Sequence, residues 1–301
     1  MKVSIREIDY LIVDGDYLAH RAYFAFTQMH GSYNTPLKTK TGILSGCFYG
    51  FFSALQRKIG DYGPKNIYVC WGDDRENLLR KEWSPEYKSN RTTMDDAFYW
   101  QVGDIKLALA HLKIPQHWAP KYEADDVIAT LVHKFDDGKN SIVVLTADKD
   151  MLQLVNENVI VAGLASSTKK SDIEYDIKHV TEKYGVGPEL IADLLTLTGD
   201  KSDGITGVNG IGEKTAASLL STLGAIKNWV NQIDTIDVSN SLREKLGSSR
   251  KQLFLNKKLI SLKAVNIELH DIITFSADSL DSADAVFDKY EMQQIRPEMF
   301  V

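Results

Sequence analysis

The stretch LIVDGD, residues 11–16, decides the fold, because a run of branched apolar residues passes directly into an acid. Such a run predicts a buried strand, and Asp14 then lies at the carboxyl end of that strand. In open α/β sheets, ligands bind at the edge that the carboxyl ends of the strands form. Four further stretches bring acids to apolar runs, and they read YVCWGDD (68–74), KYEADDVIA (121–129), VVLTADKDM (143–151) and LTLTGDKSDG (195–204).

The acids in these five stretches predict a cation site. Carboxylates that share one site repel one another, so they cannot all ionise unless positive charge joins them. No His accompanies them and Cys70 belongs to no metal-binding spacing, so the oxygen ligands favour Mg²⁺ or Mn²⁺ over zinc. The acids are Asp14, Asp16, Asp73, Asp74, Glu123, Asp125, Asp126, Asp148, Asp150, Asp200 and Asp203.

The composition is that of a soluble globular protein, with 44% hydrophobic and 25% charged residues over 301 positions. That length allows one large domain, or one domain with a smaller companion. Cys47 and Cys70 are far apart and fit a reducing compartment, and no apolar run reaches the roughly 18 residues of a membrane span. We therefore expect a cytoplasmic protein without a membrane partner.

The net charge of −6 argues at first against a nucleic-acid partner. Nine of the eleven acids in the five stretches, all except Asp16 and Asp74, are assigned to the cation site, and without them 32 acidic residues remain against 35 basic residues. The overall charge therefore does not exclude a polyanionic substrate, and the placement of the basic residues decides the question.

The first half of the chain alternates strand and helix patterns. Continuous apolar runs predict strands buried on both faces, and helical periodicity lies between them. This alternation predicts an α/β fold with a mostly parallel sheet and right-handed crossovers. The expected strands are 10–13, 66–71, 114–118, 141–146 and 158–164, and the expected helices are 17–26, 43–59, 99–112 and 124–135.

Beyond about residue 180, strand signals fade and helical segments dominate, at 188–198, 214–223 and 241–262. We therefore divide the chain into an α/β domain over 1–179, a helical domain over 180–270 and a tail over 271–301 that packs on the core.

A glycine-rich stretch, GITGVNGIGEKTA over residues 204–216, opens one of these helices. Glycines let backbone amides approach a phosphate, and a helix N-terminus adds partial positive charge. The pattern is that of a helix–hairpin–helix, which grips a DNA backbone without reading its sequence. A simple turn and cap would explain any one of these glycines alone. The carbonyl groups of such a loop can also hold a monovalent cation such as K⁺.

The segment RENLLRKEWSPEYKSNR, residues 75–91, combines basic and aromatic side chains. Basic residues follow phosphates and aromatic faces stack on unpaired bases, as in a path for single-stranded nucleic acid. A solvated charged helix is the plain alternative, but the position directly after Asp73 favours a functional role.

Five motifs succeed one another along the chain. They are LIVDG with RAY (11–15 and 21–23), Asp73 with Arg80 and PEYKSNR (85–91), EADD (123–126), DKDMLQLV (148–155) and GDKSDGITGVNGIGEKTA (199–216). In their content and order they resemble the 5′-nuclease family, meaning flap endonucleases and the 5′→3′ exonuclease domain of bacterial DNA polymerase I. The chain departs from that pattern at Trp71-Gly72 before the acid, at Gly204 in place of Asn and at Thr206 in place of Pro.

The resemblance implies a PIN/5′-nuclease-like domain with a helical arch at about 75–115, followed by the helix–hairpin–helix domain. It also implies two Mg²⁺ or Mn²⁺ ions. The tighter position would use Asp14, Asp73, Glu123, Asp125, Asp148 and Asp150, and Asp200 and Asp203 would complete the second. Asp126 is counted with this metal site but is expected to support it from outside.

The resemblance further implies roles in DNA binding and hydrolysis. Lys88 and Arg80 would reach the scissile phosphate, and Tyr87 would stack on a base. The other expected DNA contacts are Arg21, Arg91, Gly207, Val208, Gly210, Ile211, Gly212, Lys214 and Thr215.

The implied activity is structure-specific hydrolysis of DNA, as a 5′→3′ exonuclease and 5′-flap endonuclease in replication or repair. The substrate would carry a 5′ flap, a nick or a free 5′ end, with RNA–DNA hybrids and RNA-primer removal as a variation. The chain is too short to include a polymerase and looks like a stand-alone, bacteriophage-like member. We expect a monomer in a bacterial or phage-infected cytoplasm, with a polymerase or single-strand binding protein as a possible partner.

Two other functions stay open at this stage. A phosphatase of the haloacid dehalogenase type would use Asp14 and Asp16 as nucleophile and acid. A DNA-junction-binding module would keep the fold without catalysis. For the nuclease, Asp16 is interpreted as a helix N-cap and Asp74 as a solvated neighbour of Asp73.

Overall fold

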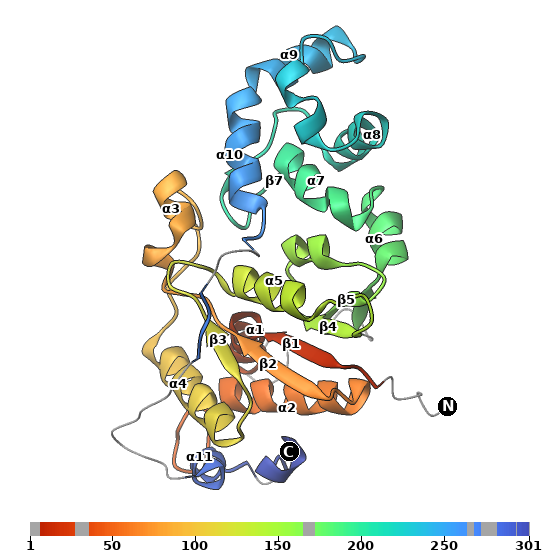
Figure 1. The fold of residues 1–301 in the computed structure, drawn as a ribbon. Coiled ribbons are helices and arrows are strands. Elements are labelled where there is room, and N and C mark those ends of the chain that lie inside the picture. Colours follow the sequence, from red (N-terminus) through yellow and green to blue (C-terminus); the bar gives the residue numbers. More distant parts are fainter. Residues whose placement is uncertain are drawn as a thin grey trace.

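The computed structural model describes residues 7–27, 36–164, 172–263, 268–271, 282–292 and 294–300. Its centre is a seven-stranded sheet in the order β6-β5-β4-β1-β2-β3-β9 (Figure 1). The strands are β1 (Tyr10–Asp14), β2 (Asn66–Cys70), β3 (Gln116–Trp118), β4 (Ile142–Leu145), β5 (Val159–Gly163), β6 (Ile173–Tyr175) and β9 (His270–Asp271).

The inner part of the sheet is parallel, as the sequence predicts. β1 pairs in parallel with both β2 and β4, and Asp14 lies opposite Cys70 in the register. The two edge strands, β6 and β9, are antiparallel and short, and the sequence did not predict them.

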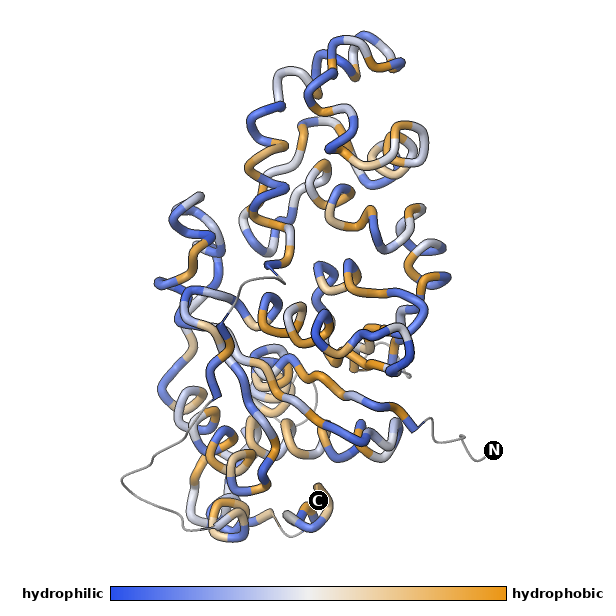
Figure 2. The backbone as a smooth tube through the Cα atoms, in the orientation of Figure 1, coloured by the Kyte–Doolittle hydropathy of each residue, from blue (hydrophilic) through white to orange (hydrophobic). Residues whose placement is uncertain are grey.

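Successive β1 residues face opposite sides of the sheet, so both faces are buried. Leu11 and Val13 lie in one hydrophobic cluster, whereas Ile12 lies in the other. Figure 2 shows hydrophobic colour along most of β1. This double burial explains why the strand is a continuous apolar run.

Helices cover the two faces of the sheet. The cluster around Leu11 contains residues of α1 (Gly15–Thr27), α2 (Gly46–Tyr62), α4 (Asp96–His111) and α11 (Ala283–Lys289), together with the terminal turn η6 (Pro297–Phe300). The cluster around Ile12 contains residues of α5 (Ala124–Phe135) and of the 3₁₀ helix η2 (Lys149–Leu154).

The helical region that follows forms the upper part of the molecule in Figure 1. Its elements are α6 (Ile177–Tyr184), η3 (Pro188–Leu190), α7 (Ile191–Thr198), the small strands β7 (Gly199–Asp200) and β8 (Ile205–Thr206), α8 (Glu213–Leu223), η4 (Ile226–Asn228), η5 (Val230–Gln232), α9 (Asn240–Ser248) and α10 (Arg250–Ile260). The single helix predicted over 241–262 is divided at Ser249, where α9 ends and α10 begins.

The basic segment stands away from the sheet. It contains η1 (Arg75–Asn77) and α3 (Leu79–Trp83), and residues 92–95 lead from it to α4. No helix within the described ranges is both long and apolar enough to cross a membrane.

Candidate metal centre and DNA-binding surface

A pocket of about 1560 Å³ opens where β1 and β4 end. It brings together carboxylates from separate segments of the chain with several cationic side chains, as the sequence pattern predicts. Its acidic lining includes Asp14, Asp16, Asp73, Asp74, Glu123, Asp125 and Asp148, and its basic lining includes Arg21, Arg75, Lys88, Arg91 and Lys106.

Asp14 is held at the junction of β1 and α1. The Tyr17 N–H donates to Asp14 Oδ1 over 2.9 Å, and the Thr146 hydroxyl donates to Oδ2 over 2.8 Å. Asp14 therefore caps α1, and the interpretation of Asp16 as the N-cap is wrong. Asp16 lies in the first helical turn, and its Oδ2 accepts from the Gly72 N–H over 2.8 Å.

The pKa values of three pocket carboxylates are raised. Burial and the charge of Asp16 raise the pKa of Asp14 to about 7. Burial and the charge of Asp148 raise the pKa of Asp125 well above its usual range, and burial also raises the pKa of Asp148. Their negative charge is therefore poorly compensated by the protein itself, which is the situation that a cation relieves.

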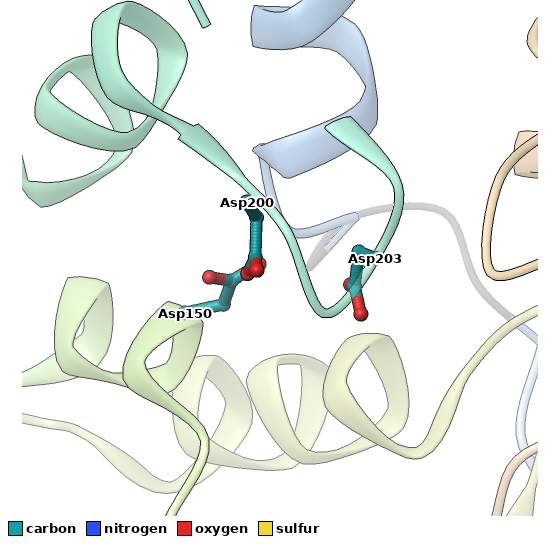
Figure 3. Close-up of side chains that lie close together, drawn as sticks. All are labelled: Asp150, Asp200 and Asp203. Carbon is teal, nitrogen blue, oxygen red and sulfur yellow. The ribbon is translucent and has the colours of Figure 1, made fainter. Parts of the chain in front are cut away.

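A second group of acids lies beside the first. Asp150, Asp200 and Asp203 each offer an oxygen atom, and these three atoms lie within 4.8 Å of one another (Figure 3). Asp150 comes from η2, whereas Asp200 ends β7 and Asp203 lies in the turn before β8. The structure thus groups Asp150 with Asp200 and Asp203, whereas the sequence assigned it to the other cation position.

This second group is buried and only partly neutralised. Asp150 Oδ1 has no hydrogen-bond partner among the described residues, and burial together with Asp148 raises the pKa of Asp150 well above its usual range. For Asp200, burial acts in the same direction, but Ser202 and Lys149 outweigh it and lower the pKa.

Lys88 and Arg91 place positive charge against these acids. The Lys88 ammonium contacts Glu123 Oε1 and lies 3.6 Å from Asp203 Oδ2, and Arg91 Nη2 lies 2.5 Å from Asp203 Oδ1. Burial raises the pKa of Glu123, but Lys88 and then Arg80 outweigh it and hold that pKa below its usual range. The Lys88 backbone has a φ of 53°, and its N–H donates to the Asp203 carbonyl, which ties the basic segment to the hairpin.

Three predicted site residues are placed differently from expectation. Arg80 is 4% exposed and binds Asp126 through two nitrogen atoms, so it does not reach a phosphate. Asp126 is fully buried in that ion pair and is not among the residues that line the pocket, so the structure does not support counting it as a metal ligand. Tyr87 is 3% exposed and donates its hydroxyl to Glu123 and Asp203, so it cannot stack on a base.

Asp73 lines the pocket, and its carboxylate accepts hydrogen bonds from two backbone N–H groups. Its Oδ2 accepts from the Lys121 N–H over 2.7 Å, and its Oδ1 accepts from the Asp74 N–H. Asp74 is exposed and caps η1 by accepting from the Glu76 N–H.

The predicted phosphate-binding hairpin is formed by β7, β8 and the start of α8. A Cβ on Gly207 would lie 2.2 Å from the Thr198 carbonyl carbon, and Gly210 has a φ of +72°. The side chains of Val208 and Ile211 are buried in the core, so only their backbone can face DNA. Gly212, Lys214 and Thr215 are exposed at the start of α8.

Part of the pocket wall consists of residues that the sequence motifs do not indicate. Phe24 is 42% exposed and Tyr99 is 51% exposed, and both line the pocket together with Lys106 and the predicted Arg21. Helical periodicity could have indicated Phe24, because it lies one turn after Arg21 on the same helix. No comparable signal marks Tyr99, because α4 reaches the pocket only through the tertiary fold.

Family models match most of the chain. The 5′-3′ exonuclease, N-terminal resolvase-like domain matches residues 9–185, and the 5′-3′ exonuclease, C-terminal SAM fold matches residues 186–281. The two matches meet after α6, whereas the sequence places the domain boundary near residue 180.

Relatives are similar over most of the chain. A 5′-3′ exonuclease of Buchnera aphidicola is 34% identical over 89% of this chain and 86% of that protein. DNA polymerase I of Caldicellulosiruptor bescii is 34% identical over 88% of this chain, which spans only 30% of that longer protein.

A crystal structure of the T5 D15 protein with metal ions shares the fold, with a TM-score of 0.67 at 22% identity, covering 85% of this chain and 90% of that one. The two domain matches, the relatives and the acidic pocket all indicate the same family. The chain belongs to the 5′-3′ exonuclease family.

Proposed function

We propose that the protein is a structure-specific 5′ nuclease that hydrolyses phosphodiester bonds of DNA with two Mg²⁺ or Mn²⁺ ions. The observation that carries this proposal is the convergence of acids from β1, α5, η2 and the β7–β8 hairpin beside cationic side chains. Family membership excludes the phosphatase of the haloacid dehalogenase type. The retained acids argue against a binding module without catalysis.

The residues fit hard divalent cations. Their donor atoms are carboxylate oxygens, the ligands that Mg²⁺ and Mn²⁺ prefer. Asp150 Oδ1 has no hydrogen-bond partner within the ranges that the structure describes, and the raised pKa values of Asp14, Asp125 and Asp148 indicate that their ionised forms are poorly stabilised without a cation. Asp14, Asp125 and Asp148 would hold one ion, and Asp150, Asp200 and Asp203 the other. When bound, a pair of such ions activates water and stabilises the leaving oxygen.

The chain's own cations would position the scissile phosphate. Lys88 and Arg91 lie at the wall of the pocket and are paired with Glu123 and Asp203. Donors placed in advance at a site of developing charge stabilise the transition state without reorganisation. Arg21 and Lys106 would attract the phosphates next to the scissile phosphate. The aromatic rings of Phe24 and Tyr99 would stack on unpaired bases.

The helical domain that contains the β7–β8 hairpin (the hairpin domain) would hold the duplex behind the cleavage point. The backbone around Gly210 and Gly212 and the exposed Lys214 suit a DNA backbone, and the loop carbonyls could hold K⁺. Specificity would then come from the shape of a substrate with a 5′ flap, a nick or a free 5′ end. The proposal also includes RNA–DNA hybrids as substrates and a monomeric state. It further includes a replication polymerase or a single-strand binding protein as partner.

Digestion of labelled DNA tests this function. The substrates are a 5′ flap, a nicked duplex, a blunt duplex and an RNA-primed duplex, each with Mg²⁺ and with EDTA. We expect Mg²⁺-dependent release of 5′ products, fastest from the flap. Binding to the flap without cleavage at any divalent cation concentration would instead support the non-catalytic module.

Changing Lys88→Ala should slow cleavage more than it weakens binding. The single-turnover rate on the flap should fall about 10²-fold, because one preorganised donor at the reacting phosphate is lost. The dissociation constant should change only about threefold, since one phosphate contact among several is removed. Lys139→Ala, an exposed lysine in the loop before β4, is the control. A variant whose loss lies wholly in affinity would contradict this role.

Changing Gly210→Ala should weaken duplex binding about tenfold, which corresponds to about 1.4 kcal/mol. A Cβ there is strained at the φ of +72° and lies 2.9 Å from the Lys245 ammonium. Gly138→Ala is a matched control, because Gly138 has a φ of +78° and open space around it, away from the hairpin. Equal affinity losses in both variants would show that the effect is general destabilisation.

A further inference from the structure

Arg80 forms a buried ion pair with Asp126, which we call the clasp, rather than a contact with substrate. Its Nη1 lies 2.5 Å from Asp126 Oδ2, and its Nη2 donates to Asp126 Oδ1 over 2.8 Å. This two-pronged geometry is the strongest form of an arginine–carboxylate pair. Asp126 is inaccessible to solvent, so the pair is sealed inside the protein.

The Arg80 guanidinium also contacts the hairpin domain. Arg80 Nε donates to the Leu259 carbonyl over 2.7 Å, and Nη2 lies 3.4 Å from the Ser261 carbonyl. These carbonyls belong to the C-terminal end of α10, where free carbonyl groups and the helix dipole favour a cation. Asp126 completes the connection, because its Oδ1 accepts from the Lys263 N–H over 2.8 Å.

The clasp also contacts the acidic pocket. Arg80 Nη1 lies 3.1 Å from Glu123 Oε2, the carboxylate that Lys88 binds from the other side. Asp126 further accepts from the Glu123 N–H at the start of α5. One buried ion pair therefore connects α3 in the basic segment, the start of α5 and the end of α10.

A second contact holds α3 to the same place. The Lys258 ammonium lies 3.9 Å from the centre of the Trp83 ring, and the Lys263 ammonium lies 5.3 Å from it. Both lysines come from the end of α10 or from just beyond it, so α3 is attached to the hairpin domain on two sides.

We propose that Arg80 and Asp126 are positioning residues, which fix the basic segment and the hairpin domain relative to Glu123 so that bound DNA lies correctly over the acidic pocket. This inference rests on the proposed function. Arg80 acts through other residues and touches neither the phosphate nor a cation. Small misplacements of reacting groups can cost about 10²-fold in rate, so a clasp remote from the chemistry can control turnover.

The double variant Arg80→Met with Asp126→Leu tests the proposal. Removing both partners leaves no unpaired buried charge, so the fold should survive. We expect the single-turnover rate on a 5′ flap to fall about 10²-fold. The slope of log affinity against log salt should stay that of the wild type, whereas loss of a phosphate contact would reduce it by about 1.

The single variant Arg80→Lys keeps the charge and is the second test if the double variant does not fold. A lysine cannot bind Asp126 through two nitrogens and also reach the α10 carbonyls, so we expect a similar loss of rate. Near-wild-type cleavage by this variant would overturn the proposal, since the two-pronged pair and the contacts to the α10 carbonyls would then be dispensable. Lys81→Met, which removes an adjacent positive charge from α3, is the control.

A measurement of the distance between α3 and α10 tests the positioning role independently of cleavage. Spin labels at Glu82→Cys in α3 and Lys251→Cys in α10 report on the relation between the two elements, and both native cysteines are buried. We expect a narrow distance distribution with Arg80 in place and a broad one in the variants. An unchanged distribution together with a reduced salt slope would identify Arg80 as a phosphate ligand. Failure of the wild type to cleave would instead count against the proposed function alone.

Discussion

Asp148→Asn should remove DNA cleavage while leaving junction binding within a few fold. The rate should fall by at least about 10²–10³-fold, the usual cost of losing one electrostatic group at a reacting centre. Asp148 is central to the acidic pocket, because its charge raises the pKa values of both Asp125 and Asp150. Rates are measured in single turnover on a 5′ flap with saturating Mg²⁺, and binding is measured with Ca²⁺ in its place.

The control for this variant is Asp137→Asn, a fully exposed carboxylate in the loop before β4. It changes the charge by the same amount but should keep the wild-type rate. A rate for Asp148→Asn within about threefold of the wild type would refute its role as a ligand, since even supporting residues of metal sites cost more.

Without divalent cations, the protein should lose stability as the pH rises from 5 to 8. Asp14 has a folded-state pKa of about 7 against a usual value of 3.8, so its contribution to stability is complete below 3.8 and is lost as the pH rises through 7. Between pH 5 and pH 8 that loss is about 3 kcal/mol from Asp14 alone. The raised pKa values of Asp125 and Asp150 act in the same direction.

The carboxylates with lowered pKa values do not disturb this window, whereas burial lowers the pKa of His117 from its usual 6.5 and opposes the trend in the lower part of the window. Glu123 and Asp200 lose their stabilising contribution only as the pH falls toward their folded-state pKa values, which lie below their usual ranges. Melting in EDTA at pH 5 and pH 8 gives the measurement, and Asp14→Asn should reduce the difference. Mg²⁺ should restore stability at pH 8. A protein equally stable at both pH values in EDTA would contradict the account.

The sequence predicts the scaffold well because its strands are buried on both faces. Such strands must be continuous apolar runs, and β1, β2, β4 and β5 are all found within two residues of the expected positions. The short edge strands β6 and β9 were not predicted, because a strand of three or fewer residues shows no periodic pattern. The break at Ser249 was missed, although Gly247 and Ser248 directly before it are weak helix formers and could have indicated it.

The site is predicted less completely because side-chain partners depend on tertiary packing. The motifs identify which acids matter, but they do not show that Asp150 faces Asp200 and Asp203 rather than Asp14. Arg80 lies in a basic stretch, where every cation resembles a phosphate contact. Only the fold shows that a buried carboxylate already binds it.

Counting bound Mn²⁺ tests most directly whether the acids form a paired cation site. Free Mn²⁺ is followed by electron paramagnetic resonance during titration of the wild type and of the triple variant Asp150→Asn, Asp200→Asn and Asp203→Asn. The account predicts two ions for the wild type and one fewer for the triple variant. Equal numbers in both proteins, or no binding by the wild type at millimolar Mn²⁺, would contradict it.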